Sequence, residues 1–113
     1  YNYFEDKNWI YYWNKLLAIS KKYYEIIDKN FIKDDRYVFL EWKYNSQLDA
    51  KSFKKLKIPD NHMYFLELYS DKNWFYSFGQ YWNNFYKIKN NISQENMQKC
   101  LNNEDLCKNI LWY

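Results

Sequence analysis

An eight-residue pattern occurs twice in this 113-residue chain, and it constrains how the chain can pack. Residues 6–13 read Asp-Lys-Asn-Trp-Ile-Tyr-Tyr-Trp, and residues 71–78 read Asp-Lys-Asn-Trp-Phe-Tyr-Ser-Phe. In both copies an Asp that can cap a helix precedes a Trp, and a second large aromatic residue follows four positions later. That spacing stacks two side chains on one face of a helix. The repeat therefore predicts helices that pack against one another through aromatic seams.

The scarcity of turn residues supports the same expectation. Gly79 and Pro59 are the single examples of their kinds, while aromatic residues make up 25% of the chain. Sheet folds with many turns usually need Gly and Pro to separate their strands. A chain of this length has room for one core. We therefore expect an all-α fold, a small antiparallel bundle of three to four main helices that forms a single domain over residues 1–113.

Apolar periodicity places the first two helices. The first is expected over residues 6–28, with Trp9 and Trp13 on its apolar stripe. The second is expected over residues 36–56, although residues 37–44 also alternate well enough to form a strand. Helix is preferred there because an isolated strand would have no partner and would be marginally stable.

The second half of the chain predicts a long helix and two short ones. Pro59 ends what precedes it, and an apolar stripe over residues 74–88 predicts the long helix. Ser93 can cap a short helix, and Asn103 followed by two acids can start another. The residues expected to be buried on these short helices are Met97, Cys100, Leu101, Leu106, Cys107, Ile110 and Leu111.

Cys100 and Cys107 are the two cysteines of the chain. In a continuous helix a separation of seven residues spans about 10 Å, which is too far for a disulfide. The spacing therefore favours two buried thiols. The alternative is a disulfide, which requires the helix to break between them, and Asn102-Asn103 could supply that break.

The charge distribution suggests an acidic partner. Residues 1–57 carry twelve Lys or Arg against eight acids, whereas residues 58–113 carry five against six. The basic half is the expected docking region for an acidic protein. A net charge of +3 is too small to favour nucleic acid as the partner. No apolar run has the length of a transmembrane span, and no signal peptide is visible. Because the chain begins at Tyr1 and not at Met, we expect it to be a fragment of a longer protein.

Surface lysines and tyrosines are the candidate partner-binding residues. Residues 51–57 hold the densest basic cluster, and residues 21–22 lie near it if the first two helices are antiparallel. Tyrosines outside the apolar stripes are typical of interfaces. The alternatives are a solvated basic face and a core wrapped by amphipathic Tyr. The candidates are Lys21, Lys22, Lys51, Lys54, Lys55, Lys57, Tyr11, Tyr12 and Tyr23, with Tyr64, Tyr76 and Tyr86 as further surface aromatics.

No catalytic, cofactor or metal site is recognisable in the sequence. His62 is the only His and has no nucleophile at a familiar spacing. A single Gly cannot build a phosphate-binding loop, and no Ser lies in a nucleophile elbow. One His and two Cys do not make a zinc site. We therefore predict a protein that is not an enzyme and that binds no cofactor or metal.

Three short motifs resemble a known family. Trp13-Asn14 is followed nine and ten residues later by Lys22-Tyr23, and Lys57-Ile58-Pro59 opens a later segment. With these residues the chain resembles the PHIST domain of exported malaria-parasite proteins, and its abundance of Asn, Lys, Tyr and Ile is typical of an A/T-rich genome. The resemblance implies a helical bundle exported into the cytoplasm or membrane skeleton of the host red cell. It also implies an adaptor that binds acidic tails of surface adhesins or the host membrane skeleton.

Three functional hypotheses follow. The first is a helical protein-interaction module that binds an acidic or cytoskeletal protein. The second is a structural subunit of a large assembly, in which the surface aromatic residues are permanently covered. The third is a lipid-binding helical module that lies on a membrane surface.

Overall fold

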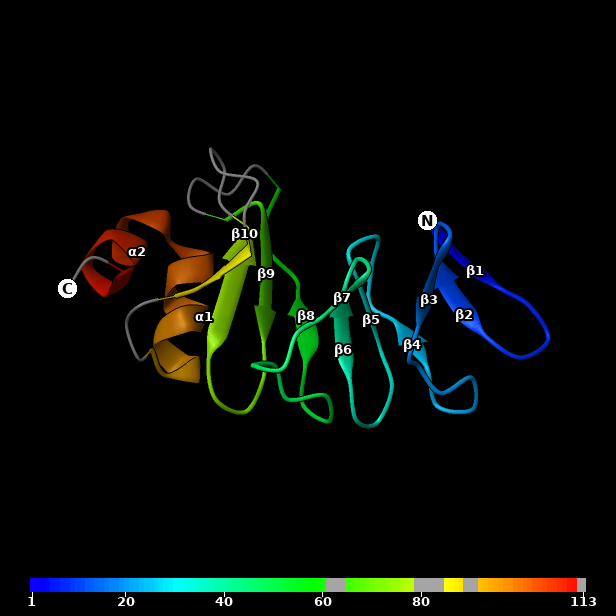
Figure 1. Cartoon of the computed structure of the whole chain (residues 1–113). Coiled ribbons are helices and arrows are strands. Elements are labelled where there is room, and N and C mark those ends of the chain that lie inside the picture. The colour runs from blue at the N-terminus through cyan, green and yellow to red at the C-terminus, as the bar shows by residue number, and fades with distance from the viewer. Residues whose placement is uncertain (61–64, 79–84, 89–91, 112–113) are drawn as a thin grey trace. The chain divides into compact units, whose positions relative to one another are not determined.

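The computed structural model describes residues 1–60, 65–78, 85–88 and 92–111, with side chains up to residue 108. The chain forms two compact units, residues 1–53 and residues 54–113. The described residues form eleven strands in three antiparallel sheets and two short helices (Figure 1). The prediction of an all-α helical bundle is therefore wrong.

The first unit contains two sheets. In the three-stranded sheet A the central strand β2 pairs with β1 and β3, so that Ile10 lies opposite Leu17. In the four-stranded sheet B the strands pair in chain order, and Ile32 lies opposite Phe39. The strands of sheet A are β1 (Tyr3–Glu5), β2 (Ile10–Tyr12) and β3 (Lys15–Leu17). Those of sheet B are β4 (Glu25–Ile26), β5 (Phe31–Lys33), β6 (Val38–Leu40) and β7 (Lys43–Tyr44).

Sheets A and B share one core. Ile10, Tyr12 and Leu17 of sheet A are buried in the same cluster as Ile32 and Phe39 of sheet B. Along β2 these inward residues alternate with outward ones, as a strand with one buried face requires. The first unit is therefore a pair of stacked sheets, and the outer face of sheet A points away from this core.

The repeated Asp residues begin hairpin turns and not helices. The Asp6 carboxylate accepts hydrogen bonds from the backbone N–H groups of Asn8 and Trp9, at 2.9 and 2.7 Å. The Asp6 N–H donates to the carbonyl of Trp9, which closes the turn. Asp71 makes the same three bonds with Asn73 and Trp74. An Asp side chain that bonds its own backbone two and three residues on is an Asx turn.

The helices expected over residues 6–28 and 36–56 are absent, since β2 to β4 occupy the first range and β6 to β8 the second. The strand alternative for residues 37–44 is correct, because these residues form β6 and β7. Glu41, in the turn between the two strands, has a positive φ of 55°. The helix was preferred because a strand here was expected to have no partner, but β6 pairs with β5 and with β7.

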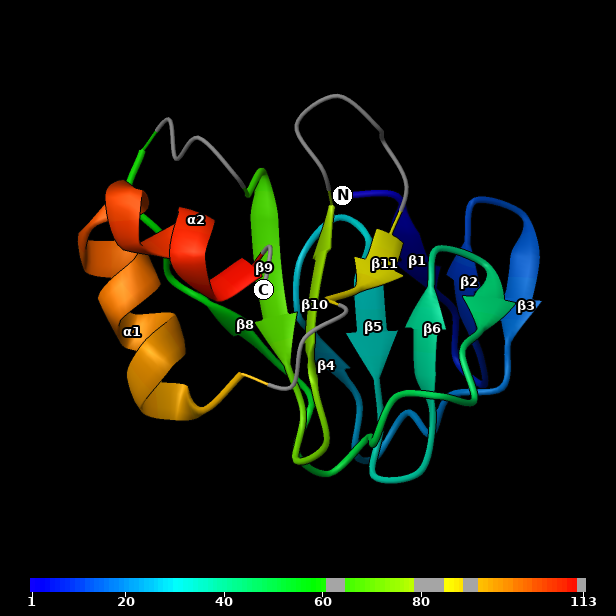
Figure 2. The same ribbon diagram turned by 90° about the vertical axis from the view of Figure 1, so that its left-hand side faces the viewer.

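The second unit is a four-stranded sheet with two helices. In sheet C the strand order is β11-β10-β9-β8, so β8 is an outermost strand of this sheet. Figure 2 shows α1 and α2 beside each other at the β8–β9 side of the sheet. The strands are β8 (Lys54–Leu56), β9 (Glu67–Ser70), β10 (Phe75–Phe78) and β11 (Phe85–Lys87), and the helices are α1 (Gln94–Asn102) and α2 (Glu104–Leu111).

The helices bury their apolar sides in the core of this unit. Met97, Cys100 and Cys107 lie in one cluster with Leu68 of β9 and Phe75 of β10. The sheet residues at these positions point to one face because side chains alternate along a strand. The core of the second unit therefore lies between sheet C and its helices.

The short C-terminal helices are the confirmed part of the fold prediction. α1 follows Ser93 and α2 follows Asn103, as their sequences predicted. Met97, Cys100, Leu101 and Cys107 are buried as expected, but Leu106 is exposed. The side chains of Ile110 and Leu111, together with His62 and Tyr64, lie outside the described part of the chain.

The long helix expected over residues 74–88 is wrong. Its described residues form β10 and β11, which pair so that Ser77 lies opposite Tyr86. Phe75 and Tyr76 are both buried although they are neighbours in one strand. Burial on both faces of β10 explains why neighbouring positions of this strand are both aromatic, where a strand with one buried face would alternate.

Candidate functional site

A groove with a cavity of about 500 Å³ lies along α1 in the second unit. One wall is the extended segment that continues β8, residues 56–59, and the other wall is α1. The lining residues are Leu56, Lys57, Ile58, Pro59, Gln94, Met97, Gln98, Leu101 and Asn102.

The floor of the groove is apolar. Met97 and Leu101 line it and belong to the buried core of the unit. Leu56 and Ile58 are half-buried and pack against the same core from the strand side. A floor built from core residues is held in place by the packing behind it. It can therefore receive an apolar side chain without rearrangement of the fold.

The rim of the groove on the helix side is a row of side-chain carboxamides. Gln94, Gln98 and Asn102 are exposed and stand four residues apart along α1. Four residues of helix correspond to a rise of about 6 Å, so the three side chains form a ladder along one helix face. Each carboxamide can donate and accept hydrogen bonds at the same time. The rim therefore offers paired donors and acceptors at a regular interval.

The start of α1 is fixed by its cap. The Ser93 hydroxyl accepts a hydrogen bond of 3.1 Å from the N–H of Asn96, and Ser93 itself has an extended backbone. This bond satisfies one of the N–H groups that the first turn of a helix leaves without a partner. The cap thus fixes the turn from which Gln94 projects.

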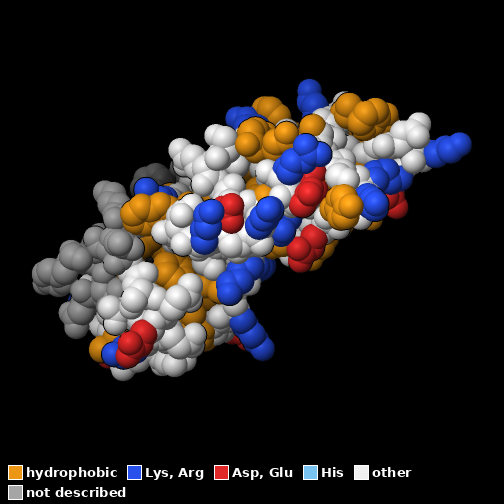
Figure 3. All heavy atoms as spheres, turned by 90° about the horizontal axis from the view of Figure 1, so that it is seen from below, with side chains coloured by type: hydrophobic (Ala, Val, Ile, Leu, Met, Phe, Trp, Pro, Cys, Tyr) orange, Lys and Arg blue, Asp and Glu red, His pale blue; other side chains and the backbone are white. Residues whose placement is uncertain are grey.

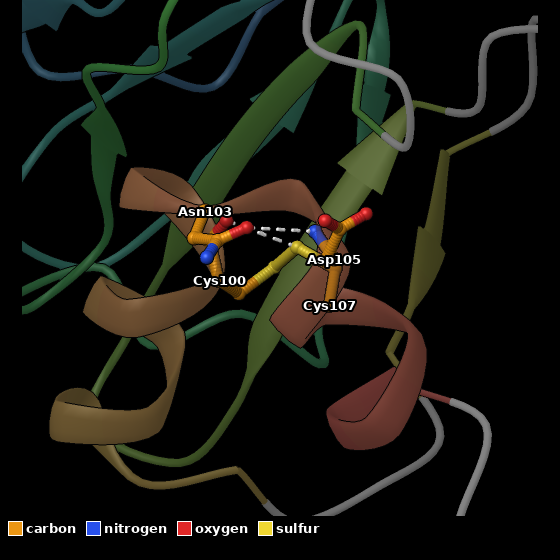
Figure 4. The surroundings of a disulfide bond; sticks show 4 residues. All are labelled: Cys100, Asn103, Asp105 and Cys107. Carbon is orange, nitrogen blue, oxygen red and sulfur yellow. Dashed lines mark hydrogen bonds between the residues drawn. A yellow bond between two sulfur atoms is a disulfide. The ribbon is translucent and has the colours of Figure 1, made fainter.

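The end of α1 is fixed by a disulfide. Cys100 near the end of α1 is bonded to Cys107 of α2, and the two Cα atoms are 4.4 Å apart (Figure 4). Asn103 between the helices has an extended backbone, and its side chain accepts a hydrogen bond of 3.0 Å from the N–H of Asp105. The chain therefore breaks where the disulfide alternative required it, and the preference for two free thiols is wrong.

Among the predicted lysines of the second unit, Lys57 lies at the groove. Lys57 and Lys54 are exposed, and Lys57 lines the groove on the strand side. Lys55 instead pairs with Glu67 at 2.8 Å across the β8–β9 ladder. Lys51 belongs to the first unit, so the predicted cluster is divided between the units.

The lysine pair of the first unit has different surroundings. The Lys21 ammonium group donates to the carbonyls of Asp6 and Lys7 and lies 3.6 Å from the Glu5 carboxylate. Lys22 is exposed, and its ammonium group lies 5.3 Å from the centre of the Tyr23 ring. Lys21 therefore holds the first hairpin together. On the face that Figure 3 shows, Lys and Arg side chains are spread among hydrophobic ones.

The predicted tyrosines divide between surface and core. Tyr23 and Tyr86 are exposed, and Tyr11 is half-buried. Tyr12 is buried between sheets A and B, whereas a surface position was expected. Tyr76 is also buried, and its ring stacks on that of Phe85 with 5.6 Å between centroids. A role in partner binding stays a prediction for the exposed rings.

The three carboxamides of the groove were not predicted from the sequence. Gln94, Gln98 and Asn102 are neither charged nor aromatic, and they occur in a chain rich in amides. The available signal was their spacing of four residues on a correctly predicted helix. Their position opposite residues 56–59 could not be read from the sequence.

The described residues contain no group of His, Cys, Asp and Glu that could hold a metal ion. In the same part of the chain, neither helix has the length and apolar character needed to cross a membrane.

No family model, no curated protein and no solved structure matches this chain. The resemblance to PHIST, and the export and location that it implies, stay predictions. The helical bundle that the resemblance implies differs from the sheets observed.

Proposed function

We propose that this chain is a non-enzymatic protein-interaction module that binds an extended, acidic segment of a protein partner in the groove along α1. The proposal keeps the acidic partner expected from the sequence and replaces the helical framework by a groove between a strand and a helix. Grooves of that kind are a recurrent way of holding extended peptides.

The observation that carries the proposal is the spacing of the rim carboxamides. Gln94, Gln98 and Asn102 are separated by about 6 Å along the helix axis. Alternate residues of an extended peptide are separated by about 6.6 Å, and their backbone groups point in the same direction. Three carboxamides at this interval can therefore bond successive peptide groups on one side of an extended chain.

The floor and the strand-side rim support a specific side-chain pattern. Met97 and Leu101 provide an apolar surface for alternate side chains of the peptide. Lys57 lines the groove on the strand side and is exposed. Carboxylates on the other alternate positions would complement its ammonium group. A peptide that alternates Leu with Asp matches both features.

Fluorescence anisotropy with a labelled nine-residue peptide of alternating Leu and Asp tests the proposal. We expect saturable binding to the 113-residue chain that weakens as salt is added, because the charges at the rim are screened. The triple variant Gln94→Ala, Gln98→Ala and Asn102→Ala should remove measurable binding. The matched control is Asn96→Ala, since Asn96 is exposed on the same helix and does not line the groove.

A second pair of variants tests the charge. Lys57→Glu should weaken binding of the Leu-Asp peptide by about tenfold, whereas Lys108→Glu on α2 should leave it unchanged. A peptide that alternates Leu with Lys should show the opposite preference for Lys57→Glu. Equal loss with Lys57→Glu and Lys108→Glu would point to nonspecific attraction and contradict the proposal. Binding that survives the triple carboxamide variant would contradict it as well.

A further inference from the structure

The outer face of sheet A is an aromatic surface. Tyr11 lies between the buried Ile10 and Tyr12 of β2 and therefore points away from the core that sheet A shares with sheet B. Trp9 and Trp13 flank β2 and are exposed. In the ladder, Tyr11 lies opposite Phe4 of β1 and opposite Leu16 of β3. The outer aromatic face is the name we give to Phe4, Trp9, Tyr11, Trp13 and Leu16.

Four of these side chains are about half exposed. The exposed fractions are 51% for Phe4, 50% for Trp9, 59% for Trp13 and 55% for Leu16. The rings of Phe4 and Trp13 lie 6.2 Å apart, which joins two strands of the face. A contiguous apolar surface of this kind usually marks a contact site, whereas a single exposed ring does not.

The backbone at Trp13 gives a second, independent observation. Trp13 is the first of the two residues that connect β2 to β3, and its φ is +53°. This region of φ favours Gly, because a Cβ atom is crowded there. The turn itself does not require an indole, since Glu41 takes the same backbone conformation at the matching place in the β6–β7 turn.

The chemistry of the outer aromatic face selects its occupant. None of its five side chains carries a charge, and the Asp6 carboxylate that meets the face accepts a hydrogen bond from the Tyr11 hydroxyl. Its exposed apolar area is roughly 400 Å², because each large side chain exposes about half of its usual surface area. A standard interface buries about 800 Å² on each partner, and about 65% of a homodimer interface is apolar. The face thus supplies most of the apolar core that one half of a dimer needs.

We infer that the outer aromatic face pairs two copies of this chain, sheet A against sheet A. The inner face of sheet A already shows this mode of packing, because Ile10, Tyr12 and Leu17 are covered by sheet B. The same kind of contact between copies would bury Phe4, Trp13 and Leu16. The inference rests on residues of the first unit and is independent of the groove in the second.

Sedimentation equilibrium of the 113-residue chain over a wide range of concentrations tests the inference. We expect a reversible monomer–dimer equilibrium. Leu16→Lys places two like charges at the contact and should raise the dissociation constant at least about tenfold. Trp13→Ser should have a similar effect. The matched control is Trp42→Ser, since Trp42 is an equally exposed Trp in the hairpin turn of sheet B and should leave the equilibrium unchanged.

The outcomes separate clearly. Circular dichroism and thermal unfolding of each variant show whether sheet A remains folded, and a folded Leu16→Lys monomer supports the inference. A wild-type chain that stays monomeric at millimolar concentration overturns it, and so does a dimer that persists in folded Leu16→Lys and Trp13→Ser. Equal weakening by Trp42→Ser would place the contact elsewhere and overturn it too. Lys57→Glu should leave the dimer intact, so failure of the groove proposal is recognised separately.

Discussion

The hydroxyl of Tyr76 donates a hydrogen bond of 3.0 Å to the carboxylate of Asp71, five residues earlier in the chain. Tyr11 and Asp6 repeat this contact at 2.8 Å in the first unit. In both places the other oxygen of the Asp carboxylate caps the turn that joins two strands. The two copies of the sequence repeat are therefore the same structural device, a hairpin turn whose Asp also binds a Tyr on the following strand.

Replacement of Asp71 should destabilise the second unit. Asp71 is buried, and Asp71→Ala removes the acceptor for two backbone N–H groups and for the Tyr76 hydroxyl. We expect a loss of about 3 kcal/mol in the free energy of unfolding, since buried donors would be left without partners. Asp71→Asn keeps an oxygen that can cap the turn and should cost less. Urea denaturation followed by circular dichroism measures both changes.

The exposed copy of the turn provides the control. Asp6 is exposed, so water can replace the lost hydrogen bonds in Asp6→Ala. We expect a clearly smaller loss of stability than for Asp71→Ala. Tyr76→Phe should likewise cost more than Tyr11→Phe, because Tyr76 is buried and Tyr11 is half-buried. Equal effects at both copies would show that burial does not set the strength of this device.

Asp34 should make the first unit sensitive to acid. Burial raises the pKa of Asp34. Hydrogen bonds from the N–H groups of Ser20, Arg36 and Tyr37 lower the pKa by more than burial raises it, so the pKa lies below its ordinary value. A carboxyl whose pKa is lower in the folded state stabilises the fold above its unfolded pKa of about 3.9. That contribution is lost as the pH falls through the lower pKa of the folded state.

Thermal unfolding at a series of pH values from 7 to 2 checks this expectation. The wild-type chain should lose stability as the pH drops below about 4. Asp34→Asn keeps a side-chain oxygen but cannot titrate, so its stability should change less over that range. Asp6, whose pKa is lowered by hydrogen bonds from Asn8, Trp9 and Tyr11, remains in this variant and contributes in the same direction. An unchanged acid transition in Asp34→Asn would assign the sensitivity to other carboxyl groups.

The helix prediction at the repeated Asp was wrong for a physical reason. An Asp carboxylate that accepts from N–H groups two and three residues later is the same chemistry at a helix N-cap and in a hairpin turn. A spacing of four residues puts two side chains on one face of a helix, because it is close to 3.6, and on one face of a strand, because it is an even number. The helix and the hairpin differ in whether neighbouring strands pair, and this pairing depends on residues beyond a short stretch of sequence.

The scarcity of Gly and Pro did not prevent a sheet fold, because other residues make the turns. Asp6 and Asp71 build their turns with side-chain hydrogen bonds, and Trp13 and Glu41 adopt positive φ without being Gly. Ser93, in contrast, predicted its helix correctly because a cap acts within one turn. The fold could thus be predicted where local bonds decide it, and the groove could not, since residues 56–59 meet α1 through the tertiary packing of the second unit.

Removal of the disulfide should weaken the second unit and leave the first unchanged. The bridge joins Cys100 and Cys107, both fully buried, across a short loop that contains Asn103. For a closed loop of this size, loss of the cross-link is expected to cost about 2.5 kcal/mol by the chain-entropy relation. The double variant Cys100→Ala and Cys107→Ala should show this loss in urea denaturation.

Hydrogen exchange localises that effect. Amide protection in α1 and around Leu68 should fall in the double variant, while protection in β2 and β5 should not change. Chemical reduction of the wild-type chain should reproduce the result. Loss of protection in both units together would show that they unfold as one.

Ser93 links the stability of α1 to the groove. Ser93→Ala removes the bond between the Ser93 hydroxyl and the N–H of Asn96, and a lost cap of this kind costs about 1 kcal/mol. Because the first turn then frays, Gln94 spends less time on the rim, and binding of the Leu-Asp peptide should weaken about twofold to fivefold. Ser93→Asp retains an acceptor and adds a favourable charge at the helix start, so it should restore both stability and binding. Thermal unfolding and anisotropy on the same samples measure the two together, and a stability loss in Ser93→Ala with no change in binding would remove Gln94 from the rim.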